Sequence, residues 1–154
     1  MKRLHKITAL VMMVMMLVGL TACSKKTAIS VEEFNDTLES KGYTIEDATG
    51  QLAPDSITAI SLALSDNYQI EFYEFVDDRT ANAVFQENKI IFERAADSGA
   101  SAEITKNLMN YNYYSASTSS TFYMLAKIDN TMLYVEADVA YKDEIVEIVK
   151  ELGY

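Results

Sequence analysis

Polar and apolar residues alternate with two different periods along the chain, and each change of period predicts a change of element. Apolar side chains spaced three to four residues apart indicate amphipathic helices over 31–41, 78–96 and 140–152. Between these helices every second residue is apolar, a pattern typical of strands with one buried face. The predicted strands are 44–48, 57–64, 68–76, 111–117, 122–128 and 132–137.

Residues at the helix ends support this assignment. Ser30, followed three residues later by Glu33, forms a capping box before the first helix, and Gly42 is placed to end that helix. Asp77 or Asp78 is the expected N-cap of the second helix, because a carboxylate there can accept from unpaired backbone N–H groups. We therefore expect these two helices to begin and end close to the capping residues.

The predicted order is helix, three strands, helix, three strands, helix, so the fold class is α+β with antiparallel strands (α-βββ-α-βββ-α). An Asp-Asn turn occurs in each half, at 66–67 and 129–130, and the first and last helices both end in Gly-Tyr. A duplicated unit of one helix and three strands would produce these similarities between the halves, and two independent hairpins would produce them as well. All these elements belong to one domain, predicted over 30–154.

The first part of the chain has the three-part pattern of an export signal. A basic start precedes an apolar stretch over 7–20, which spans about 21 Å as a helix and is too short for the ~30 Å hydrocarbon core. The stretch ends in Leu-Thr-Ala-Cys, and this tetrad resembles the lipobox of bacterial lipoproteins. We predict a signal peptide over 1–22, cleavage between Ala22 and Cys23, and a diacylglyceryl thioether on Cys23.

A short tether over 23–29 follows the predicted lipid. Five extended residues reach at most about 17 Å, so the domain would sit close to the membrane. Lys25 and Lys26 would lie beside the headgroups, or would be solvated tether residues. The alternative for the whole region is an ordinary secretory signal cut at another small residue, which would leave Cys23 as a free thiol.

Charge and composition exclude several function classes. The chain has 13 basic and 23 acidic residues, and removal of 1–22 leaves 10 basic against 23 acidic, a balance of −13. A nucleic-acid partner is therefore excluded, because no basic surface is available to replace phosphate counterions. The same cleavage removes the only histidine, His5, which excludes Ser-His-Asp and Cys-His catalysis and Cys/His zinc sites. We expect no metal and no cofactor.

Carboxylates are the remaining catalytic candidates. Glu71 shares a strand face with Tyr73 and is the candidate carboxylate of a hydrolase. Hydrolysis of a glycosidic bond needs two carboxyl groups about 5 to 9.5 Å apart, and neighbours in sequence rarely provide such a pair. The alternative is that Glu71 is one of many solvated surface acids.

The segment 110–114 is the candidate binding region. Tyr111 and Tyr113 are expected on one strand face, with Asn110 and Asn112 beside them, an arrangement against which a sugar ring or an extended peptide could dock. The alternative is a strand of high aromatic propensity, with Tyr114 in the core.

Several short motifs accompany the lipobox. They are Glu33-Phe34, Lys41-Gly42-Tyr43, Gln69-Ile70-Glu71-Phe72-Tyr73, Asn110-Tyr111, Asp129-Asn130-Thr131, Tyr134, Tyr141-Lys142-Asp143-Glu144-Ile145 and Lys150-Glu151-Leu152-Gly153-Tyr154. Together they resemble a group of small lipoproteins from low-GC Gram-positive bacteria. The resemblance implies a location on the outer face of the cytoplasmic membrane, and it assigns neither an activity nor a catalytic residue. In a Gram-negative source the lipid anchor would place the protein in the outer membrane.

These observations leave two hypotheses about function. The first is a membrane-anchored, extracytoplasmic domain without enzymatic activity that binds an envelope ligand or a membrane-protein partner. The second is a carboxylate-dependent hydrolase that acts on cell-envelope polymers through a residue such as Glu71.

Overall fold

The computed structural model describes residues 25–52, 55–96, 99 and 102–154 of the 154-residue chain. The predicted signal peptide, its cleavage site and Cys23 lie outside the described residues. None of the helices within the described part is long and apolar enough to cross a membrane.

Seven strands form one antiparallel sheet in the order β1-β2-β3-β7-β6-β5-β4. The strands are β1 Thr44–Asp47, β2 Ile57–Leu64, β3 Gln69–Phe75, β4 Ala102–Leu108, β5 Tyr111–Ser117, β6 Thr121–Ile128 and β7 Thr131–Asp138. The helices of the described residues are α2 Val31–Ser40, α3 Thr49–Leu52, α4 Asp78–Ala96 and α5 Lys142–Glu151, with a 3-10 turn, η2, at Val139–Tyr141. The predicted α+β class with antiparallel strands is confirmed.

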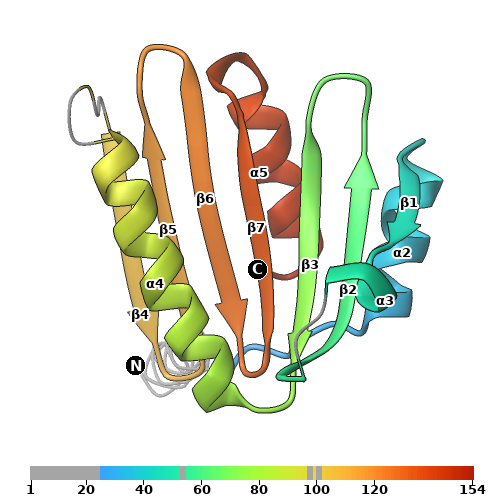
Figure 1. The fold of residues 1–154 in the computed structure, drawn as a ribbon. Coiled ribbons are helices and arrows are strands. Elements are labelled where there is room, and N and C mark those ends of the chain that lie inside the picture. Colours follow the sequence, from blue (N-terminus) through green and yellow to red (C-terminus); the bar gives the residue numbers. More distant parts are fainter. Residues whose placement is uncertain (1–24, 53–54, 97–98, 100–101) are drawn as a thin grey trace, which may run out of the picture.

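Helices cover both faces of this sheet (Figure 1). The long helix α4 lies across one face, over the half formed by β4, β5 and β6, and α2 and α5 lie behind the sheet on the other face. We call these the α4 face and the α5 face. Apolar side chains from the helices and the sheet fill a separate core on each side. Phe34, Phe72 and Ile145 are fully buried on the α5 face, and Phe85 and Leu125 on the α4 face.

The capping signals in the sequence act as predicted. The Glu33 backbone N donates to Ser30 Oγ at 3.2 Å, so Ser30 caps α2. Gly42 follows the helix with φ +92°, a conformation that favours glycine. Of the two aspartates proposed for α4, Asp77 is the cap, because its Oδ1 accepts from the Thr80 backbone N at 2.7 Å.

The predicted order is wrong in its second half, where β4 adds a fourth strand. The observed order is α-βββ-α-ββββ-α, with α3 and η2 as further short elements, so the two equal units of one helix and three strands do not occur. Strand β4 is an edge strand that pairs only with β5, and its residues 103–108 are exposed. Without a buried face, the strand does not show the apolar alternation from which the other strands were predicted.

Two meanders meet at the centre of the sheet. Strand β3 ends the first meander and pairs with β7, the last strand of the second, so that Phe72 lies opposite Leu133. Because successive side chains alternate between faces, Tyr111 and Tyr113 of β5 lie on the α5 face and Tyr114 on the α4 face. The predicted placement of Tyr114 in the core is confirmed.

Candidate functional site

A cleft of about 260 Å³ lies on the α5 face, between α5 and the hairpin of β4 and β5. The antiparallel register brings Lys106 of β4 opposite Tyr113 of β5, so both side chains reach this cleft. Helix α5 presents Lys142 and, two turns later, Lys150 from the other side. The remaining lining residues are Ile104, Tyr111, Ser115, Asp143, Val146, Val149 and Tyr154.

Two lysines of this cleft lie near aromatic rings, of which Tyr113 lines the cleft and Phe122 is buried outside its lining. The Lys106 Nζ lies 5.5 Å from the centre of the Tyr113 ring, and the Lys142 Nζ lies 5.8 Å from that of Phe122. Within the described part of the chain, neither of these lysines nor Lys150 belongs to a salt bridge. Asp143 is the single acidic residue among the lining side chains. The cleft therefore concentrates unpaired positive charge in a chain whose formal net charge is −10.

Lys26, in the predicted tether, lies beside the cleft and contacts Tyr111, one of its lining residues. Its Nζ lies 4.2 Å above the Tyr111 ring and donates to the Gly153 carbonyl at 2.7 Å. Partial burial, and then the neighbouring charge of Lys106, lower the pKa of the Lys26 ammonium. Burial raises the pKa of the Tyr113 phenol.

The structure brings together only part of the candidate binding region. Tyr111 and Tyr113 are neighbours, with ring centres 6.3 Å apart. Tyr111 is only 5% exposed, since Lys26 covers it, and Tyr113 is half-buried. Asn110 holds the tether, and Asn112 lies on the α4 face, where its Nδ2 donates to Asn107 Oδ1 at 2.8 Å. A ligand in the cleft would therefore meet Tyr113 without either amide side chain.

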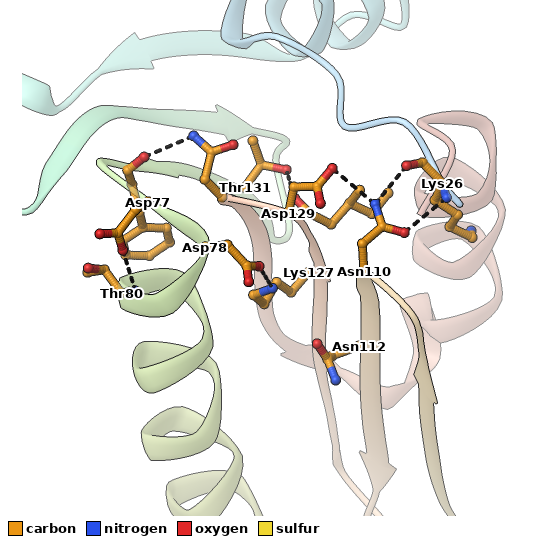
Figure 2. A network of polar contacts seen from close by, with 12 residues as sticks. Lys26, Asp77, Asp78, Thr80, Asn110, Asn112, Lys127, Asp129 and Thr131 are labelled. Carbon is orange, nitrogen blue, oxygen red and sulfur yellow. Dashed lines mark hydrogen bonds and ion pairs between the residues drawn. The ribbon is translucent and has the colours of Figure 1, made fainter. Parts of the chain in front are cut away.

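Asn110 belongs to a polar network at the end of the sheet where the tether enters (Figure 2). Its Nδ2 donates to Asp129 Oδ2 at 3.0 Å. The other carboxylate oxygen of Asp129 lies 3.4 Å from Lys25 Nζ. Lys25 and Lys26 thus contact the domain itself. Figure 2 shows Asn112 apart from this network.

A second charged contact joins α4 to β6 at the same end. Lys127 of β6 is 2% exposed, and its ammonium group donates to Asp78, the first residue of α4. The carboxylate of Asp78 is largely exposed. A buried cation is therefore held by a single carboxylate at the surface, and Figure 2 shows the two side chains directed toward one another.

Glu71, the candidate carboxylate, lies in a different hollow on the α4 face. This hollow, of about 330 Å³, is lined by Glu71, Tyr73, Tyr134 and side chains of α4, and Glu71 is the single acid among its lining residues. Both Glu71 oxygens accept hydrogen bonds, from Gln69 Nε2 at 2.6 Å and from the Tyr73 hydroxyl. No second carboxylate completes a hydrolytic pair in this lining.

The largest of these cavities, of about 420 Å³, was not predicted from the sequence. It lies between the end of α2, the β2–β3 turn and the start of α5. The Tyr43 and Tyr68 hydroxyls are hydrogen-bonded in it, and Tyr68 donates to Glu144 Oε1 at 2.9 Å. Burial is the main cause that raises the pKa of Tyr68. Two features of the sequence could have indicated these tyrosines: Tyr43 follows Lys-Gly at the end of a predicted helix, and Tyr68 follows the Asp-Asn turn.

The described residues contain no group of three or more His, Cys, Asp or Glu side chains able to hold a metal ion. Comparisons of the chain with protein-family models, with curated proteins and with solved structures give no match.

Proposed function

We propose that this protein is a lipid-anchored, extracytoplasmic binding module that takes an anionic ligand of the cell envelope in the cleft between α5 and the β4–β5 hairpin. The anchor is the predicted thioether on Cys23, and the membrane is the outer face of the cytoplasmic membrane, or the outer membrane of a Gram-negative source. The signal peptide and lipobox in the sequence support the location.

One observation carries the binding function. Three lysines without carboxylate partners, Lys106, Lys142 and Lys150, converge on one partly enclosed cleft of an otherwise strongly acidic domain. Maintaining like charges near one another raises the free energy of the folded domain, and an anion would offset that cost. The half-buried ring of Tyr113 supplies a flat apolar face beside the cations. An acidic sugar ring combines the two properties that this surface complements.

The experiment compares an acidic with a neutral sugar oligomer. We expect the mature domain to bind an oligogalacturonate, and to bind a galactose oligomer of equal length much more weakly, by calorimetric titration. Lys142→Gln and Lys150→Gln should each lower the affinity about fivefold to tenfold, because each removes one charge-assisted contact. Added salt should weaken binding of the acidic oligomer.

Arg94→Gln is the matched control, since it removes the same charge from an exposed position near the end of α4, on the opposite face. It should leave the affinity unchanged. Equal binding of the acidic and neutral oligomers, or equal effects of the Arg94 and Lys142 substitutions, would contradict the proposed site.

The alternative hydrolase has a direct test. Turnover of cell-wall fragments would be measured for the natural domain and for Glu71→Gln. Turnover that the substitution abolishes would favour the hydrolase over the binding module, whereas activity insensitive to it would exclude Glu71 as the catalytic carboxylate.

A further inference from the structure

We propose that the tip of the β4–β5 hairpin, Leu108 and Met109, is a second membrane contact that holds the domain in one orientation on the bilayer. This inference rests on the lipid anchor of the proposed function. It concerns a surface at the end of the sheet, separate from the lysine-lined cleft.

The chain enters the domain at this tip, and the entry is fixed by four contacts. The Asn110 side chain pairs with the backbone of Lys26 twice, since its Oδ1 accepts from the Lys26 N at 3.1 Å and its Nδ2 donates to the Lys26 O at 2.8 Å (Figure 2). The Lys26 ammonium group adds its contacts with Gly153 and the Tyr111 ring. Lys26 is thus held at the hairpin, and the tether does not start as a free linker.

Chain connectivity then limits where the lipid can be. Cys23 precedes Lys26 by three residues, which span at most about 11 Å when fully extended. Met109 is bonded directly to Asn110, the residue that holds Lys26. While these contacts persist, the acyl chains on Cys23 must enter the membrane close to the hairpin tip.

The tip itself has the composition of an interfacial contact. Leu108 is 60% exposed and Met109 is 81% exposed, the highest value among the exposed large hydrophobic residues of the described chain. Met109 lies in the turn with φ +37°, where it projects beyond the paired strands. Apolar side chains at this position would be buried at the boundary between headgroups and acyl chains.

Charge at this end of the domain favours the same orientation. The body of the mature protein is strongly acidic and would be repelled by anionic lipid. Here, however, Asp129 is paired with Lys25 and Asp78 with Lys127, and Lys106 lies close enough to Lys26 to lower its pKa. Two acidic side chains at the end that carries the apolar tip therefore have cationic partners.

The test uses a single tryptophan, excited selectively over the tyrosines, because the chain contains no tryptophan of its own. M109W would be produced as the full-length precursor in cells, purified with its lipid, and reconstituted into vesicles of phosphatidylglycerol and phosphatidylcholine that carry bromine near the headgroups. We expect a blue shift of its emission and a loss of intensity to the bromines. I91W is the matched control, because Ile91 is 51% exposed on α4, away from the hairpin tip, and its emission should be unaffected.

The outcomes separate this inference from the function on which it rests. Flotation of the protein with the vesicles, and mass spectrometry of Cys23, report the anchor independently of the fluorophore. A floating, lipidated protein whose M109W emission is not quenched would overturn the membrane contact alone. Quenching of both variants to the same extent would show that the domain lies on the bilayer without a fixed orientation, and would also overturn it. An unlipidated protein that stays in solution would overturn the anchor and this inference together.

Discussion

The side-chain amide of Asn110 makes two hydrogen bonds with the backbone of Lys26, a residue 84 positions earlier in the sequence. It accepts from the Lys26 N–H and donates to the Lys26 carbonyl, as the backbone of a neighbouring strand would. This contact converts the segment after the predicted lipid from a linker into part of the domain. It also identifies a single side chain whose loss should release that segment.

Asn110→Ala should free the tether without unfolding the sheet. The substitution removes the two contacts with Lys26 and the one with Asp129, and at a partly buried site we expect a loss of about 1 to 3 kcal/mol. Limited proteolysis of the mature domain should show faster cleavage before residue 30. Asn112→Ala is the control, since that exposed amide has one contact with Asn107 and should cost less than about 0.5 kcal/mol. Equal protease sensitivity of the two variants would contradict the conclusion that the Asn110 side chain holds the tether against the domain.

The buried Lys127 and the exposed Asp78 of the ion pair should respond unequally to substitution. Asp78→Asn leaves the Lys127 ammonium buried without its carboxylate, and we expect a loss of about 1 to 3 kcal/mol, since the exposed side of the pair can admit water. Lys127→Met replaces the cation by an apolar chain of similar length and leaves Asp78 solvated at a helix N-terminus, so the change should be within about 1 kcal/mol.

Denaturant titration of both single variants and of the double variant measures this asymmetry. The double variant should recover most of the stability lost in Asp78→Asn. No recovery would mean that the carboxylate acts through the helix and not through Lys127.

Tyr114→Phe should stabilise the domain. Within the described residues, the buried Tyr114 hydroxyl makes no hydrogen bond, and its removal should relieve a cost of about 1 to 2 kcal/mol. Tyr154→Phe removes a buried hydroxyl that is paired with Thr131, and should destabilise by about 1 kcal/mol. The two melting temperatures should therefore move in opposite directions. A lower melting temperature for both variants would show that the Tyr114 hydroxyl has a partner, such as a buried water.

The domain should lose stability at alkaline pH. Burial, with smaller effects of nearby acids, raises the pKa of Tyr134 and of Tyr114 to about 12. Below pH about 10 the tyrosines are protonated in both the folded and the unfolded chain, so their contribution to stability is fully present. Between pH 10 and 12 the unfolded chain releases these protons while the folded chain retains them, and the free energy of unfolding falls.

Tyrosinate absorbance and circular dichroism, followed together during a pH titration, measure this loss. Ionisation of the buried tyrosines should coincide with unfolding, and Tyr134→Phe should move the midpoint to higher pH. Completion of the tyrosinate change near pH 10 with the secondary structure intact would argue against the raised pKa values.

Local patterns were sufficient to predict six of the seven strands and the three longer helices near their observed positions. The cap Ser30 was predicted, and the second cap was narrowed to Asp77 or Asp78, because capping depends on residues within one turn of the helix. Strand β4 was missed because an exposed edge strand has no buried face to produce alternation. The pair of Tyr111 and Tyr113 on one face follows from the strand period alone, but the covering of Tyr111 by Lys26 does not.

Local residue patterns account for the predicted helix caps, the period of each element, the predicted export and lipidation signal, and the absence of histidine from the predicted mature chain. The lysine-lined cleft, and the contact that holds Lys26 at Asn110, arise from the packing of distant segments and could not be predicted from local patterns. Lys106 and Lys142 meet because the β4–β5 hairpin and α5 pack on the same face of the sheet, and Lys26 reaches Asn110 because the tether returns to the end of that hairpin. Contacts between residues this far apart depend on strand order and helix placement, and the periodicity of a single segment carries no information about either.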